Sequence, residues 1–156
     1  MEQALANEQT TPTGKALTYQ TRFGEVTLRE DRLISFPTGI LGFNDCTVFG
    51  LSKIPNADES PLLLLQCVNE PEVCFLVADP AVLGLDIKAE DMNNALTESG
   101  MDKTNTQFLV ILTMYEQENS HYLTANLRAP ILIDSVKRTA LQHILSNKDY
   151  TTQHKI

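Results

Sequence analysis

The chain has 156 residues, enough for one domain with a substantial core and too few to suggest a second domain. Aromatic residues make up only 6% and Trp is absent, so the core must be built from Leu, Ile and Val with a few Phe. The formal net charge of −8 argues against a nucleic acid-binding surface. No stretch reaches the roughly 18 apolar residues that a membrane helix needs.

The N-terminal residues 1–17 are rich in Gln, Thr, Ala and Glu. Such a composition cannot bury enough apolar surface to offset the entropy lost when the chain is ordered. The segment also lacks the basic start and apolar region of a secretion signal. We therefore expect a disordered tail at 1–17, one folded domain at 18–156, and a cytoplasmic protein.

The folded part begins with short strands, which we expect at residues 19–23, 26–28 and 33–36. The next stretch, FPTGILGF at 36–43, sets a proline and two glycines among four large apolar residues. Gly39 and Gly42 can take a positive φ at little steric cost. This pattern predicts a sharp corner whose apolar side chains are all buried.

The middle of the chain predicts a strand at 48–51, an exposed loop at 54–61, and two apolar strands at 62–68 and 73–78. The turn 69–72 joins the last two as a hairpin, because Pro71 presets its own φ and Asn69 can cap the turn. Both strands lack a polar face, so we expect them to be buried on two sides.

One convincing helix covers residues 89–99, with acidic residues in its first turn and Gly100 just past its end. Strands are expected at 108–115, 122–127 and 131–133, whereas 139–145 fits either a short helix or an edge strand. Many short strands against one helix predict a mainly β, single-domain antiparallel fold that resembles a barrel.

Negative charge is concentrated in the middle of the chain. Residues 54–118 hold twelve acidic and two basic side chains, a net of −10, while the rest of the chain sums to +2. A face of this sign attracts basic protein surfaces and repels phosphates. It could also be a solvated surface that serves solubility only.

Catalytic and cofactor patterns are missing. Cys46, Cys67 and Cys74 have neither C-x-x-C nor metal-ligand spacing and are interpreted as buried thiols. His121 and His143 lie in no recognisable catalytic pattern, and neither does His154. No nucleotide-binding glycine motif is present. We expect no enzyme, cofactor or metal site, and a module that acts by binding.

Four stretches together resemble the flagellar assembly factor FliW family. Phe23-Gly24-Glu25 followed by FPTGILGF is similar to its opening motifs, and LLLLQCVNEPEVCFLVADP at 62–80 to its central strand pair. LTANLRAPILID at 123–134 and DYTTQH at 149–154 are similar to its later strand and ending. The resemblance covers 18–156 and favours a strand at 139–145. Gln153 replaces a usual basic residue and Asp134 a usual amide.

This resemblance implies a protein that binds two partners in exclusive turn, flagellin and the basic RNA-binding dimer CsrA. Free family members prevent CsrA from repressing translation of flagellin mRNA, and accumulating flagellin restores repression. We predict that the partner-binding residues are acids forming a rim and two leucines serving as apolar anchors: Glu70, Glu72, Asp79, Asp86, Glu90 and Asp91, with Leu83 and Leu85. The alternatives are a flagellin chaperone without CsrA binding and a β-barrel that holds a small ligand.

Overall fold

The structure, a computed structural model, describes residues 15–156. It is mainly β with one α-helix, α1 at Ala89–Ser99, and two short 3-10 helices, η1 at Glu30–Arg32 and η2 at Pro80–Leu83. The strands are β2 Ala16–Thr21, β3 Gly24–Arg29, β4 Ile34–Ser35, β5 Val48–Lys53, β6 Leu63–Cys67, β7 Cys74–Ala78, β8 Thr106–Gln117, β9 Ser120–Ala125, β10 Ile131–Asp134, β11 Thr139–Gln142 and β12 His154–Lys155. The predicted fold class is therefore confirmed.

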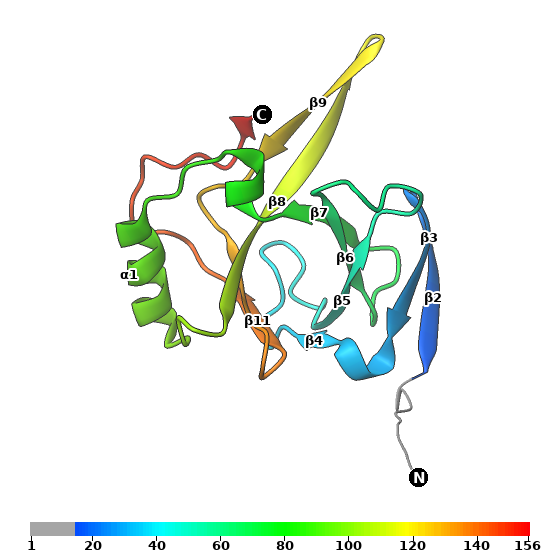
Figure 1. The fold of residues 1–156 in the computed structure, drawn as a ribbon, viewed down its shortest axis with the longest axis horizontal. Helices are drawn as coiled ribbons and strands as arrows, with labels where there is room; N and C mark the ends of the chain where they lie inside the picture. Colours follow the sequence, from blue (N-terminus) through cyan, green and yellow to red (C-terminus); the bar gives the residue numbers. More distant parts are fainter. Residues whose placement is uncertain (1–14) are drawn as a thin grey trace.

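Seven strands form a closed ring, in the order β10-β11-β4-β5-β6-β7-β8, because β10 pairs with β8 as well as with β11. Ile131 in β10 lies opposite Gln142 on one side and Leu109 on the other. Beyond the ring, β8 continues into a long hairpin with β9, which projects from the body of the molecule (Figure 1). The short β12 pairs with β9 at the base of this hairpin.

The interior of the ring is filled by side chains that alternate along its strands. Phe36 and Phe49 meet there edge to face, with ring centroids 4.8 Å apart. Other members of this cluster are Ile34, Ile40, Cys46, Leu65, Cys67, Val77, Leu109, Ile131, Ile133 and Ala140. This packed interior disfavours a small ligand held inside the ring.

A second core cluster lies outside the ring, where the β2–β3 hairpin and α1 cover it. Val26 and Leu28 come from the hairpin, and Ala95 and Leu96 come from α1. They share one cluster with alternate residues of the ring strands, including Leu64 and Leu76. Because β6 and β7 face both clusters, they are buried on two sides, as predicted.

The sharp corner in the FPTGILGF stretch is confirmed, but the burial expected for all its apolar residues is wrong. Gly39 and Gly42 have φ of 69° and 83°, and Ile40 and Phe43 pair through backbone hydrogen bonds. Phe36 and Ile40 are buried, whereas Leu41 is 57% and Phe43 41% exposed. Leu41 lies at the tip of this small turn, where its side chain is directed away from the core.

The helix at Ala89–Ser99 is confirmed, and the ambiguous region contains a strand, β11, that ends at Gln142. The predicted tail falls largely on residues 1–14, which lie outside the described residues, and β2 begins within its last two residues. No helix within residues 15–156 is long and apolar enough to span a membrane.

Candidate functional site

Asn69 holds the β6–β7 turn against the loop that precedes β5. Its Oδ1 accepts hydrogen bonds from the backbone N–H groups of Thr47 and Val48, both at 3.2 Å. Its Nδ2 donates to the carbonyl oxygen of Asp45 at 2.6 Å. The side-chain amide thus forms hydrogen bonds through both its oxygen and its nitrogen, and it links two segments that are distant in sequence. Sequence reasoning expected Asn69 to cap its own turn and missed this contact.

The joined segments bring apolar and acidic groups to one part of the surface. The exposed Phe43 ring lies edge to face on Phe75 of β7, with centroids 5.0 Å apart. Asp45, Glu70 and Glu72 lie on the two segments that Asn69 connects. We call these five residues, Phe43, Asp45, Glu70, Glu72 and Phe75, the loop–turn surface.

The carboxylates of this surface crowd one another. The pKa of Glu70 is raised, first by a hydrogen bond with Glu72, then by the negative charge of Glu72, with smaller effects from burial and from Asp45. Adjacent like charges disfavour the ionised form in this way. The surface is therefore negatively charged, and a cationic group bound there would reduce the repulsion between its carboxylates. Asp45 lies outside the acidic stretch that the sequence singled out, so charge counting missed it.

The other predicted residues follow β7 in the chain, from Asp79 at the N-cap of η2 to Asp91 in the first turn of α1. Asp79 caps η2, since its Oδ1 accepts a hydrogen bond from the N–H of Ala81 at 2.9 Å. Leu83 and Leu85 are half-buried against the outer core cluster, and Asp86 is exposed. Val82, immediately before Leu83, is 60% exposed and is the better apolar candidate for a partner contact.

Asp91 and Glu90, in the first turn of α1, differ in their surroundings. Glu90 is exposed. Asp91 accepts hydrogen bonds from the Tyr150 hydroxyl at 2.6 Å and from Asn147 at 3.1 Å. The Tyr150 bond is the main cause of a lowered Asp91 pKa. The Tyr150 oxygen also accepts from the N–H of Lys88. Asp91 therefore holds the C-terminal segment to α1.

The eight predicted residues thus form two groups rather than one rim. Glu70 and Glu72 precede β7, and the other six follow it. A five-residue strand spans about 17 Å, so one small contact would not reach both groups. Partner binding by either group stays a prediction.

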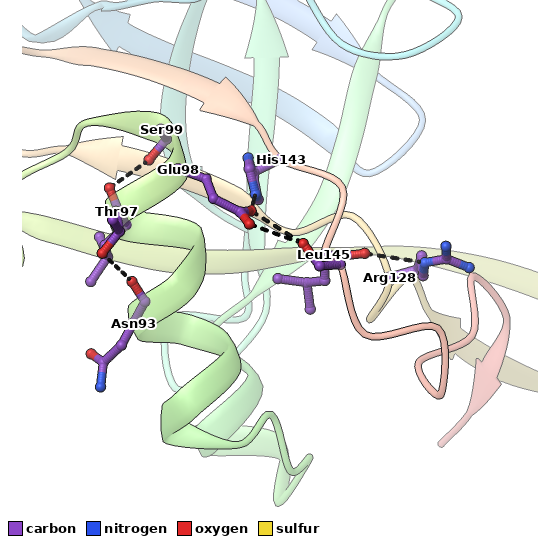
Figure 2. A network of polar contacts seen from close by, with 9 residues as sticks. Asn93, Thr97, Glu98, Ser99, Arg128, His143 and Leu145 are labelled. Atoms are coloured by element: carbon purple, nitrogen blue, oxygen red, sulfur yellow. Dashed lines mark hydrogen bonds and ion pairs between the residues drawn. The ribbon is translucent and has the colours of Figure 1, made fainter.

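The C-terminal end of α1 is fastened to the segment after β11, as Figure 2 shows. Glu98 Oε1 lies 2.8 Å from Nε2 of His143, and Ser146 Oγ donates to Glu98 Oε2 at 3.0 Å. The bond with His143, followed by that with Ser146, lowers the pKa of Glu98. Arg128 donates to the Leu145 carbonyl at 3.4 Å. This role of His143 was missed because its partner lies 45 positions away.

The thiols are poorly suited to nucleophilic chemistry. Cys46 and Cys67 are buried and Cys74 is half-buried. Burial, followed by a hydrogen bond with Cys67, raises the pKa of Cys46 to about 12, and burial raises that of Cys74 to about 11. Both groups therefore stay protonated near pH 7. Within residues 15–156, no group of three or more His, Cys, Asp or Glu side chains could hold a metal ion.

Comparisons with known proteins agree with one another. The model of the FliW protein family matches residues 17–156. The flagellar assembly factor FliW of Bacillus velezensis is 36% identical, over 85% of this chain and 91% of the relative. That of Thermosipho africanus is 32% identical, over 88% and 94%. A solved structure described as the flagellar assembly factor FliW superimposes with a TM-score of 0.68 at 29% identity, covering 90% of this chain and 96% of the other.

Proposed function

Because this chain belongs to the FliW family of flagellar assembly factors, we propose that it binds the translational regulator CsrA and flagellin in exclusive turn. Free protein sequesters CsrA and relieves its repression of flagellin mRNA translation. Flagellin that accumulates in the cell captures the protein and restores repression. These two competing binding equilibria, with CsrA and with flagellin, couple flagellin synthesis to flagellar assembly. The protein acts by binding rather than by catalysis.

The single observation that best supports CsrA as a partner is the loop–turn surface. Three carboxylates lie beside an exposed aromatic ring, and their crowding raises the pKa of Glu70. The resemblance to FliW implies that CsrA, the partner, is a basic protein. Complementary charge raises the rate of encounter and selects orientation, while a central aromatic group supplies affinity. We propose that CsrA contacts this surface.

The second group, around η2, is a further proposed contact. Asp79, Asp86 and Glu90 would contribute charge there, and Leu83 and Leu85 would contribute apolar contact together with the more exposed Val82. Because Asp91 is bonded to Tyr150, its charge is less available to a partner. Because translation takes place in the cytoplasm, the proposed function places the protein there.

Titration calorimetry tests the proposal. The protein is titrated with purified CsrA from the same organism, alone and after saturation with flagellin. Tight binding that flagellin abolishes is the expected result. Binding to flagellin without binding to CsrA would instead indicate a flagellin chaperone, and absence of both interactions would overturn the proposed function.

A further inference from the structure

A cavity of about 450 Å³ opens beside the loop–turn surface, between the β2–β3 turn and the β6–β7 hairpin. Its walls include the aromatic side chains of Phe43 and Phe75, the polar side chains of Gln66 and Glu72, and Arg22 from the β2–β3 turn. It differs from the ring interior because it is open to solvent. Its walls combine hydrogen-bond acceptors with aromatic carbons.

Gln66 is a fully buried polar residue in the wall of this cavity. Its Nε2 donates to the carbonyl oxygens of Cys67 at 2.9 Å and Pro71 at 2.7 Å. These two bonds fix the orientation of the amide, since reversal would bring oxygen against both carbonyls. Its Oε1 is buried and has no hydrogen-bond partner within the described part of the chain. Buried polar atoms in proteins are usually hydrogen-bonded, so an N–H donor that reaches this wall would find an unused acceptor.

The carboxylate of Glu72 provides a second acceptor in the wall. Glu70 lies close to Glu72, and Asp45 lies close to Glu70; the hydrogen bond and repulsion from Glu72, with a smaller effect of Asp45, raise the pKa of Glu70. A cation beside Glu72 would relieve this repulsion. The two acceptors and the local charge therefore select a ligand that donates hydrogen bonds and carries positive charge.

The aromatic residues narrow the choice of cation. Phe43 and Phe75 meet edge to face, and Phe43 is 41% exposed. A guanidinium group is planar, stacks on aromatic rings, and presents five N–H donors in a rigid fork. An ammonium group is compact and strongly hydrated, so it packs less favourably against aromatic side chains.

We propose that this cavity binds an arginine side chain from a partner protein, with its guanidinium against Phe43 and donating to Glu72, and that a small shift of the side chains around Gln66 brings a second N–H donor to Gln66 Oε1. Recognition uses the same groups of the cavity whether CsrA or flagellin supplies the arginine. We call this proposed site the arginine socket. It adds a specific contact to the general charge attraction of the loop–turn surface.

Arg22 supplies an internal check of this proposal. Its guanidinium lies 4.9 Å from the centre of the Phe23 ring, and no ion pair between Arg22 and Glu72 is present in the described region. Arg22 therefore leaves the Glu72 carboxylate available but repels an incoming cation. Removing its charge should strengthen arginine binding, an effect opposite to that of removing Glu72.

The test uses a tripeptide, acetyl-Gly-Arg-Gly-amide, titrated into the ¹⁵N-labelled full chain and followed by amide shifts. The matched probe replaces arginine with citrulline, its neutral analogue of similar shape. We expect saturable shifts around residues 66–75 with the arginine peptide, with a Kd on the order of millimolar, and much smaller shifts with citrulline. Equal shifts with both peptides, or no saturable shift, would overturn the proposal.

Variants then locate the site. Glu72→Gln should weaken arginine binding about fivefold, Arg22→Gln should strengthen it about twofold, and Glu59→Gln in the exposed loop 54–61 should leave it unchanged. Gln66→Met should weaken binding and is interpreted only if its thermal unfolding resembles wild type. If the Gln66→Met variant is destabilised, Glu72→Gln and Arg22→Gln still test the site. Equal effects of Glu72→Gln and Glu59→Gln on arginine binding would refute the assignment. Calorimetry with CsrA and flagellin is unaffected by failure of the peptide to bind, so the two proposals fail separately.

Discussion

Leu28 of β3 lies directly against the backbone of Gly50 in β5, where an added Cβ would stand 2.6 Å from Leu28 Cδ1. Both residues are buried, so little free space surrounds this contact. The absence of a side chain at position 50 lets the β2–β3 hairpin pack closely over the ring. The outer core cluster that buries the second face of β6 and β7 depends on this approach.

Gly50→Ala should therefore lower the free energy of unfolding by about 1–3 kcal/mol, because the new methyl group displaces Leu28. Chemical denaturation measures the change. Leu28→Ala alone should cost about 2–5 kcal/mol. In the double variant the two costs should be less than additive, since the smaller side chain accommodates the new Cβ. Additive costs would show that Leu28 is not what opposes a side chain at position 50.

The corner loop offers a matched pair of glycines. Gly39 and Gly42 both have positive φ. A Cβ at Gly39 would lie 2.7 Å from the carbonyl oxygens of Phe43 and Asn44, whereas a Cβ at Gly42 would meet nothing within 4 Å. Gly42→Ala should cost about 1 kcal/mol from backbone strain alone, and Gly39→Ala at least about 2 kcal/mol because it adds a clash. Denaturant unfolding checks the order, and equal losses would contradict it.

The contact between Tyr150 and Asp91 predicts a pH dependence of stability. The pKa of Asp91 is lowered in the folded protein, chiefly by this hydrogen bond. Its contribution is therefore complete above the unfolded value of about 3.9 and is lost as the pH falls through the lower folded value. Tyr150→Phe should lower Tm by about 2–5 °C at pH 7, and the difference should shrink as the pH falls through the lowered pKa of Asp91.

Thermal unfolding of the wild type and Tyr150→Phe across pH 2–7 measures this prediction, roughly spanning the titration of carboxylates. Tyr115→Phe is a suitable control, because Tyr115 stacks on Tyr122 in the projecting hairpin, far along the chain from Asp91. A Tm difference for Tyr150→Phe that stays constant down to pH 2 would indicate that Asp91 is not the group responsible.

The acidic turn should govern the rate of CsrA association. Replacing Glu70 and Glu72 together by Gln should slow association about fivefold to tenfold at low salt, with little difference at high salt, because screening removes long-range attraction. Surface plasmon resonance at two salt concentrations measures this. The control is Asp58→Asn with Glu59→Gln, which removes the same charge from the loop 54–61. Equal slowing by both pairs would implicate net charge rather than the turn.

Most secondary-structure elements were predictable because their signals are local. The helix at Ala89–Ser99 follows from acidic residues at its start and Gly100 after its end. The hairpin around Pro71 follows from turn chemistry between two apolar runs. The exposure of Leu41 and Phe43 was not predictable from hydrophobicity, since it depends on which side of the corner faces the core.

The candidate site was predictable only in part. Glu70 and Glu72 were identified from their charge and their place in a turn, but Asp45 joins them through Asn69, 24 positions away. The proposed arginine socket depends on residues of three separate segments, and no motif marks the buried amide oxygen of Gln66. Such a site leaves no pattern of spacing because its parts meet only after folding.

The sequence by itself determined the family, the mainly β class, the single helix and the acidic middle, since motifs, periodicity and charge are properties of residues close in the chain. Only the tertiary structure decided that β10 closes the ring on β8, that the eight predicted residues separate into two groups along β7, and that Asp91 is bonded to Tyr150. The physical reason is that these features depend on contacts between distant residues, such as Leu41 with Gln142, 101 positions apart, which form only when packing brings their segments together.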